Sequence, residues 1–283
     1  MNNSFVLKGN ICQTITSKEL DLHENAFAVC VDGVSKAGYF CLVFQNMFLK
    51  IIMQRRNIMI KNRTTQLIFQ TIYCTLGVVG CIAGLGIFDN IKLIRWDFYV
   101  HFTNISNYFC LGVMIAALIQ TVKKKEDSYV STAPVLKFVG MLGILLTFLV
   151  FNILLAGAEG RDPQANWRIG SLLAHVVLPI MYIADWFLFY ERKKCKWYYP
   201  LVSVAFPLAY VVFLLIQAII LKFDSSILIP TTTTPLIYPY FFVNLETQGI
   251  SGVLMWSGIL SAAFVVMGFA FFGLDRILKR KNA

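Results

Sequence analysis

The stretch YPLVSVAFPLAYVVFLLIQAIIL, residues 199–221, carries no charged side chain over its whole length. A helix needs about 20 apolar residues to cross the hydrocarbon core of a bilayer, so this stretch is long enough to span a membrane. Helix is the expected form because lipid offers no partners to backbone polar groups, and the alternation of a barrel strand is absent. The stretch therefore predicts an integral membrane protein.

Five further apolar runs have a similar length. The six predicted spans are residues 66–88, 100–122, 134–156, 169–190, 199–221 and 250–274. They predict an all-α, polytopic membrane bundle of six transmembrane helices within residues 61–283. The composition agrees, since 14% of the residues are charged, whereas about one quarter are charged in a soluble domain.

The number of lysine and arginine residues alternates between high and low from one connection to the next. Fifteen lie in residues 55–63 just before the first span and in the 123–125, 192–196 and 276–281 connections, against five in the three other connections. The positive-inside rule therefore predicts that both ends of the six-span unit are cytoplasmic. The net charge of +10 lies in short clusters between apolar runs, where anionic lipid explains it better than nucleic acid does. We expect membrane lipids as partners and no nucleic acid.

Cysteine and histidine give no sign of a metal or cofactor site. The seven cysteines include no CxxC pair, and the three histidines form no cluster with carboxylates at ligand spacing. We expect free thiols, no metal and no cofactor.

Residues 1–60 are predicted to be a separate N-terminal extension. The run FAVCV, then Asp32-Gly33, then VSKAGYF is typical of a β-hairpin. FVLKGNICQTITSKELDLHENAFAVCVDGVSKAGYF, residues 5–40, is similar to the opening strands of bacterial guanine deaminases but includes none of that family's catalytic positions. We interpret it as a fused remnant or an upstream start, with Met53 or Met59 as alternative starts, and infer no deaminase activity.

Polar side chains gather at the start of the second span in HFTNISNYF, residues 101–109. Thr103, Ser106, Asn107 and Cys110 fall at i, i+3, i+4 and i+7, so one helix face carries them. That face is expected to look into the protein rather than into lipid. We call these four residues the polar stripe.

The fourth span contains His175, with Pro179 four residues later. The proline cannot donate to the His175 carbonyl and should bend the helix there. If the first span runs outward, Thr103 and His175 share a leaflet. An imidazole in a bilayer suggests a functional site, with Thr103, Asn107 or Asn152 as partner across the bundle. The alternative is that these groups only hold helices together by hydrogen bonds.

Two features of the spans have structural interpretations. Asp185 is expected to pair with a base such as Arg192 or Lys194, or to bond within the bundle. Gly80 and Gly84 form a GxxxG pattern, for which close helix packing is expected.

The connection 222–249 is long, nearly uncharged, and rich in proline and aromatic residues. We expect it to fold back over the mouth of the bundle, either as an ordered lid without chemistry or as a gate. Asn244 and Glu246 are its polar candidates for contact with the pocket.

Four separate motifs resemble the bacterial six-span membrane proteins of the Pr6Pr family. They are FTNISN, HVVLPIMYIADWFLF, YPYFFVNLETQG and FGLDRIL, and the resemblance covers roughly residues 66–278. Phe241 and Asn244 depart from the proline and the acid that the loop pattern leads us to expect. The resemblance implies a multi-pass protein of the bacterial cytoplasmic membrane, without an assigned activity.

The family is also distantly similar to the eukaryotic androgen-induced membrane proteins, which hydrolyse fatty acid esters of hydroxy fatty acids. That similarity implies Thr103 as nucleophile and His175 as base. A neutral amide such as Asn107 could then donate to the oxyanion, so it is the candidate oxyanion donor. Ser106, Asn152 and Tyr238 join Asn244 and Glu246 as candidate binding residues for a lipid ester or another small molecule. A non-enzymatic transporter or lipid-binding protein, or a structural protein, is the alternative, and the oligomeric state stays open.

Overall fold

The computed structural model describes residues 60–85, 99–124, 133–156, 163–190, 194–223 and 237–277. Within these ranges, six helical segments are long and apolar enough to cross a membrane: Arg63–Gly84, Phe102–Lys123, Pro134–Ile153, Ile169–Phe189, Tyr199–Leu221 and Leu245–Ile277. Each falls close to a predicted span, so the prediction of an all-α, six-helix membrane bundle is confirmed. The predicted hairpin and the rest of residues 1–59 lie outside the described residues.

Several spans consist of more than one helical segment. The segments are α3 (Arg63–Gly84), α4 (Phe102–Lys123), α5 (Pro134–Leu149) with the π-helix η3 (Val150–Leu155), the 3₁₀ turn η4 (Pro163–Trp167), α6 (Ile169–Leu172) with the π-helix η5 (Leu173–Val177) and α7 (Leu178–Phe189), α8 (Tyr199–Ser203) with α9 (Ala205–Phe223), the 3₁₀ turn η7 (Phe241–Val243), and α10 (Leu245–Ile277).

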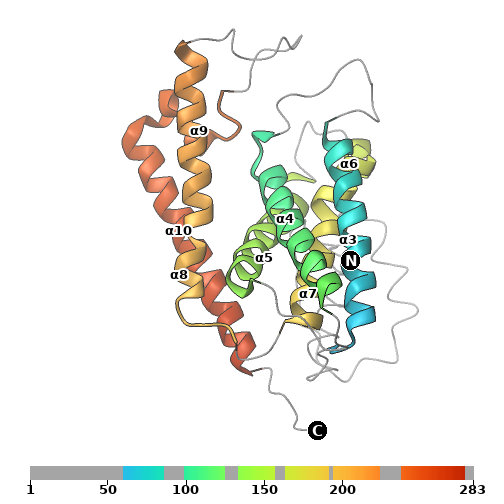
Figure 1. Ribbon diagram of the computed structural model, residues 1–283. Coiled ribbons are helices and arrows are strands. Elements are labelled where there is room, and N and C mark those ends of the chain that lie inside the picture. The colour runs from blue at the N-terminus through green and yellow to red at the C-terminus, as the bar shows by residue number, and fades with distance from the viewer. Residues whose placement is uncertain are drawn as a thin grey trace, which may run out of the picture.

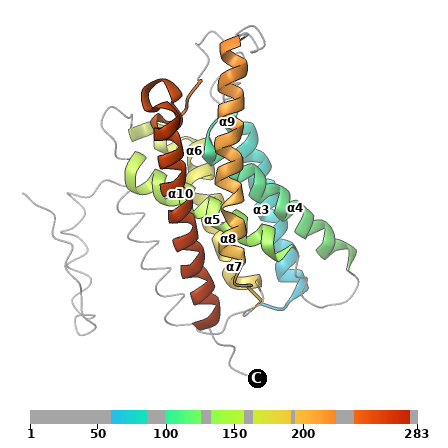
Figure 2. The same ribbon diagram turned by 90° about the vertical axis from the view of Figure 1, so that its left-hand side faces the viewer.

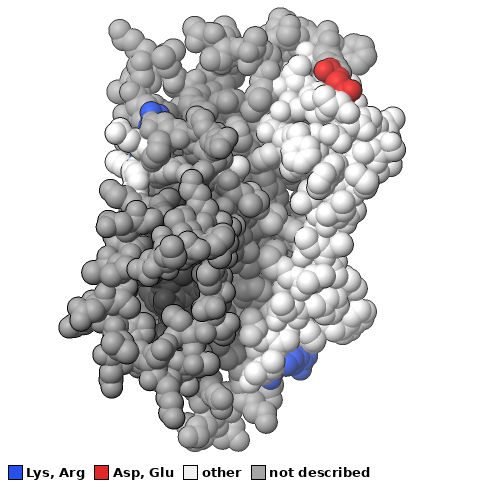
Figure 3. All heavy atoms as spheres, turned by 180° about the vertical axis from the view of Figure 1, so that it is seen from behind, with Lys and Arg blue, Asp and Glu red and all other residues white. Residues whose placement is uncertain are grey.

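The helices α3, α4, α5 and α7 pack against one another, and α9 and α10 stand beside them (Figures 1 and 2). We call the top of Figure 1, where α4, α6 and α10 begin, the upper end of the bundle. The lower end is the one where α7 and α10 finish. On the face shown in Figure 3, the visible charged side chains of the described residues lie near the two ends, and the described surface between them is an uncharged belt. Such a belt suits a bilayer.

Prolines explain two of the breaks in the spans. The proline ring clashes with the carbonyl four residues earlier, which it also deprives of an N–H donor. For Pro207 that carbonyl belongs to Ser203, where α8 ends before α9 begins. For Pro179 it belongs to His175, which lies in the π-helix η5. The predicted bend at Pro179 therefore takes the form of a widened helical turn.

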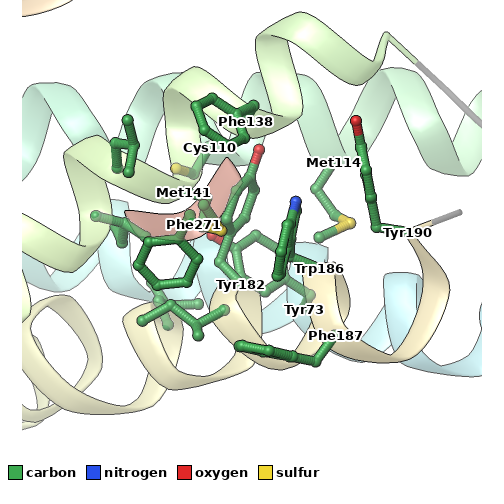
Figure 4. Packing of buried hydrophobic residues seen from close by; sticks show 14 of the residues in the cluster. Tyr73, Cys110, Met114, Phe138, Met141, Tyr182, Trp186, Phe187, Tyr190 and Phe271 are labelled. Atoms are coloured by element: carbon green, nitrogen blue, oxygen red, sulfur yellow. The ribbon is translucent and has the colours of Figure 1, made fainter. Parts of the chain in front are cut away.

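The main core lies among α3, α4, α5 and α7 and is built largely from aromatic and sulfur-containing side chains. Tyr73, Tyr182 and Trp186 are fully buried, and Figure 4 shows them among Met114 and other core residues. Of the two GxxxG glycines, Gly80 packs tightly, since an added Cβ would lie 3.2 Å from Leu178 Cδ1. At Gly84 the nearest such contact is 3.8 Å.

Candidate functional site

The polar stripe of α4 faces the interior of the bundle. Ser106, Asn107 and Cys110 are buried, and each bonds to a neighbouring span. The Ser106 hydroxyl lies 2.8 Å from the Thr147 hydroxyl, and the Cys110 thiol donates to the Gly140 carbonyl at 3.3 Å. Interhelical hydrogen bonding thus accounts for these members of the stripe.

Thr103 is the exception in the stripe. Its carbonyl accepts hydrogen bonds from Ser106 Oγ at 3.0 Å and from Asn107 Nδ2 at 2.8 Å. Its side chain is half-buried, and its hydroxyl makes no hydrogen bond to any residue in the described ranges. The hydroxyl is therefore not committed to holding α4 in place.

Pro179 disturbs the backbone hydrogen bonding around His175. The N–H of Leu178 donates to the Leu173 carbonyl, five residues earlier, instead of to Ala174. Pro179 has no N–H to offer His175. The Ala174 carbonyl thus loses its regular α-helical donor, the Leu178 N–H, to Leu173. The His175 carbonyl has no regular donor, because Pro179 stands in that position.

Two asparagines from neighbouring spans donate to these carbonyls. Asn107 Nδ2 on α4 bonds to the Ala174 carbonyl at 3.0 Å, and Asn152 Nδ2 in η3 bonds to the His175 carbonyl at 3.0 Å. A buried carbonyl without a donor costs about 1 to 3 kcal/mol, so both contacts stabilise the widened turn. Asn152, a predicted binding residue, contacts the His175 backbone in this way.

The imidazole of His175 is held on two sides. Its Nδ1 lies 2.9 Å from the Ser171 carbonyl oxygen, and its ring stacks on Phe151 with centroids 3.5 Å apart. The Ser171 hydroxyl lies 3.3 Å from the same nitrogen. Because the nearer carbonyl oxygen only accepts, this contact favours the tautomer with the hydrogen on Nδ1 and the lone pair on Nε2. The side chain is half-buried. π-Helical turns such as η5 occur frequently at functional sites.

Asn107 links the two predicted catalytic residues through the backbone. Its single amide nitrogen donates to the carbonyls of Thr103 and of Ala174, the residue before His175. In the described part of the chain, the Thr103 hydroxyl makes no direct hydrogen bond to the imidazole. Both amide hydrogens of Asn107 are engaged, so it has no donor left for an oxyanion, contrary to the role predicted for it.

The described part of the 222–249 connection folds back onto the start of α4. Tyr240 Oη accepts a hydrogen bond from the Phe102 N–H at 3.2 Å. From α9, Tyr210 Oη donates to the Val100 carbonyl at 2.7 Å and holds the residues just before α4. Half-buried Tyr238 packs against the same small apolar cluster, which contains fully buried Val243. This segment covers the upper end beside Thr103, as the fold-back prediction requires.

Asn244 and Glu246 are placed differently from their predicted role. Asn244 Oδ1 accepts from the N–H groups of Glu246 at 2.9 Å and Thr247 at 3.3 Å, so its side chain caps α10. Glu246 is exposed in the first turn of α10, where its charge complements the helix dipole. Structural roles thus account for both residues.

An ion pair in the lower half of the bundle was missed by sequence reasoning. Lys137 Nζ on α5 lies 2.5 Å from Asp185 Oδ2 on α7, with side chains 4% and 0% exposed. Asp185 therefore pairs with a base inside the bundle, Lys137, and not with Lys194, one of the two examples expected from the sequence; the other, Arg192, lies outside the described residues. The available signal was a lone lysine inside a predicted span.

The fold defines the class of protein, a multi-pass helical membrane protein. Among the described residues, no group of three histidine, cysteine, aspartate or glutamate side chains is arranged to hold a metal ion. Comparison with known proteins finds no matching family model, no matching curated protein and no matching solved structure.

Proposed function

We propose that this membrane protein hydrolyses a lipid ester at its upper end, with Thr103 as nucleophile and His175 as general base. The observation that supports the proposal is the fixed orientation of the His175 imidazole. The Ser171 carbonyl and the Phe151 ring orient the imidazole, and the lone pair is placed on Nε2. The carbonyl thus takes the orienting part that a carboxylate plays in many hydrolase triads.

Thr103 is the nucleophile that the geometry favours. It is the one stripe residue whose side chain is not used to join spans, and Asn107 ties its backbone to the residue before His175. A hydroxyl needs an adjacent base to become an effective nucleophile. Catalytic hydrogen bonds commonly shorten only when substrate binds, so the reaction requires the hydroxyl and Nε2 to approach at that step.

The reaction follows from these two groups. Thr103 Oγ attacks the ester carbonyl carbon while His175 Nε2 takes the hydroxyl proton. The tetrahedral intermediate expels the alcohol, which leaves with that proton, and an acyl-threonine remains. Water, deprotonated by the same nitrogen, then attacks the acyl-threonine carbonyl; the acyl–oxygen bond breaks, the fatty acid leaves, and Thr103 Oγ takes the proton back from Nε2. The oxyanion donor is a group other than Asn107.

The proposal includes the membrane in which the protein lies and its orientation there. The distribution of lysine and arginine supports cytoplasmic ends for the six-span unit, so the upper end faces outward, and the family resemblance supports a bacterial cytoplasmic membrane. The four sequence motifs support membership of the Pr6Pr family, and the Thr103 and His175 positions support a distant relation to the androgen-induced hydrolases. Exposed apolar side chains on α9 and α10 support contact of these helices with lipid.

A second candidate function is a non-enzymatic lipid- or small-molecule-binding protein. The observation that favours it is the commitment of Ser106 and Asn107 to other spans. A site that only holds a head group needs no oxyanion donor. Thr103 and His175 would then contribute to affinity and to nothing else.

Turnover of a long-chain p-nitrophenyl ester by the purified protein in proteoliposomes tests the hydrolase. We expect Thr103→Val and His175→Asn each to lower the rate at least about a hundredfold, as loss of a general base does. The asparagine retains a donor for the Ser171 carbonyl but has no basic nitrogen. Thr121→Val is the matched control, because the Thr121 hydroxyl is buried on the same helix and bonds only to the Ala117 carbonyl.

Two results would count against this assignment. Rates that both variants leave unchanged would exclude the pair from the chemistry. A wild-type protein that binds the ester in a Thr103-dependent manner without turning it over would favour the binding protein instead.

A further inference from the structure

A second polar site lies in the lower half of the bundle, around Lys137 and Asp185. Each residue is about one helical turn from the lower end of its own span, α5 or α7. Replacing a buried ion pair by apolar side chains of similar volume is often neutral or stabilising, because both charges must be desolvated. The pair is therefore not explained by stability alone.

Polar groups without a use in the packing lie nearby on α3. Gln70 is fully buried, and neither of its amide atoms has a hydrogen-bond partner among the described residues. The same holds for the hydroxyl of Tyr73, one turn further along the same face of α3. Native proteins rarely leave such groups unsatisfied, so they need an explanation.

Contacts between α3 and α7 bring these groups to the level of Asp185. The ring of Tyr73 lies 5.8 Å from that of Tyr182, and Phe69 lies 5.4 Å from Phe189 (ring centroids). Gln70 falls between these two contacts. Asp185 is an electrostatic neighbour of both Tyr73 and Tyr182. Figure 4 shows Tyr73, Tyr182 and Trp186 together in this part of the core.

The titratable and charged groups around Asp185 come from four helices. Lys137 on α5, Tyr73 on α3 and Tyr182 on α7 interact with Asp185 itself, and Cys74 on α3 and Cys110 on α4 lie beside Tyr73. Lys137 is the cation among them and Asp185 the carboxylate.

We propose that Asp185, Lys137, Gln70 and Tyr73 form a proton-binding site that is separate from the candidate hydrolase site. A proton from water at the lower end binds a carboxylate oxygen of Asp185, which forms an O–H bond and leaves the Lys137 ammonium without its counter-ion. The amide oxygen of Gln70 and the hydroxyl oxygen of Tyr73 then accept its N–H groups, directly or through water. Gln70 and Tyr73 therefore lack a hydrogen-bond partner among the described residues while Asp185 is ionised, and they bond to Lys137 once Asp185 is protonated.

Infrared spectroscopy of the purified protein in lipid nanodiscs tests this site. The carboxylic acid C=O band is followed while the pH is lowered from about 10 to about 4, a range that covers ordinary and raised carboxyl titrations. We expect a band in the wild-type protein that is missing in the double variant Lys137→Met/Asp185→Leu. The double variant keeps the core apolar and avoids the unpaired buried charge that a single substitution would leave.

The variant Gln70→Leu tests whether Gln70 takes part in the proton-binding site or is a buried amide without a role in it. If Gln70 solvates Lys137 when Asp185 is protonated, the variant moves the midpoint of the band at least about one unit towards lower pH. Gln217→Leu is the matched control, since Gln217 Oε1 on α9 is also buried without a hydrogen-bond partner in the described ranges, and no shift is expected.

Three outcomes would overturn the proposal: no carboxyl titration in the wild type over this range, the same titration in the double variant, or an unchanged midpoint in Gln70→Leu.

Discussion

At the scale of single residues, asparagine restores hydrogen bonds that proline removes. Asn152 donates to the carbonyl that Pro179 leaves without its helical donor, and Asn107 donates to the carbonyl before it. The sequence alone indicates that Pro179 frees a carbonyl. It does not indicate which side chain bonds there, because that depends on how the neighbouring helices are rotated.

A double-mutant cycle tests this pairing. We expect Asn152→Ala to lower the free energy of unfolding by about 1 to 2 kcal/mol, as loss of an interhelical hydrogen bond in a membrane does. Pro179→Ala restores an N–H opposite the His175 carbonyl, so Asn152→Ala should cost less in that background. Thr121→Ala, which touches neither group, should cost the same in both backgrounds to within about 0.5 kcal/mol. Equal costs of Asn152→Ala in both backgrounds would show that the two residues are not coupled.

Cys195, between the fourth and fifth spans, is expected to be unreactive in the folded protein. Burial raises the pKa of its thiol to about 12; Asp275 adds to the rise, and Arg276 opposes it. A raised pKa means less thiolate, roughly one thiol in ten thousand at pH 8. Alkylation by iodoacetamide, measured on the Cys195 peptide by mass spectrometry, should be at least about a hundredfold slower in the folded than in the denatured protein. Comparable rates would contradict the burial of this thiol.

At the scale of helices, the sequence predicts some interruptions and misses others. Pro179 and Pro207 mark the widened turn η5 and the break between α8 and α9. The run VFNILL, which forms the π-helix η3, contains neither proline nor glycine and so carries no sequence signal of an interruption. Gly249 has φ +63°, a backbone conformation that favours glycine, and it separates the first turn of α10 from the rest. The predicted span start at residue 250 falls on the far side of this kink.

The contact of α10 with α8 depends on Gly268. A Cβ added there would lie 2.9 Å from Pro200 Cβ and 3.0 Å from Pro200 Cα, and the backbone of Pro200 has little freedom to move. We expect Gly268→Ala to lower stability by about 1 to 3 kcal/mol, the usual cost of overpacking.

Gly258 on the same helix provides the control, since a Cβ there meets nothing within 4 Å. Gly258→Ala should be neutral or should gain up to about 1 kcal/mol from helix propensity. Stability measured by denaturation in mixed micelles compares the two variants. Equal effects of the two substitutions would mean that α8 and α10 do not approach as closely as described.

At the scale of the whole molecule, run length and charge were sufficient for the six-helix architecture. Apolar runs predict spans because the bilayer penalises unpaired backbone groups, a constraint that acts on each segment separately. The inward orientation of the polar stripe followed in the same way, since polar groups avoid lipid. The Lys137–Asp185 pair could not be predicted with its partners, because contact between two spans depends on their packing. The same limit applies to the engagement of Asn107.

The proposed orientation predicts where the C-terminus lies. Alkaline phosphatase needs disulfides and is active only when exported, so its fusion after residue 283 should be inactive. A fluorescent protein that folds in the cytoplasm should be bright when fused at the same position. An active phosphatase fusion would invert the orientation and place the Thr103 end inside the cell.

The most direct test of the central claim is the site of covalent labelling by a fluorophosphonate probe, located by mass spectrometry on the purified protein. The account predicts an adduct on Thr103 that is lost in Thr103→Val and weakened at least about a hundredfold in His175→Asn, because the base that activates the hydroxyl is gone. Labelling that is equally strong in Thr103→Val, or the absence of any adduct on Thr103 in the wild type, would contradict it.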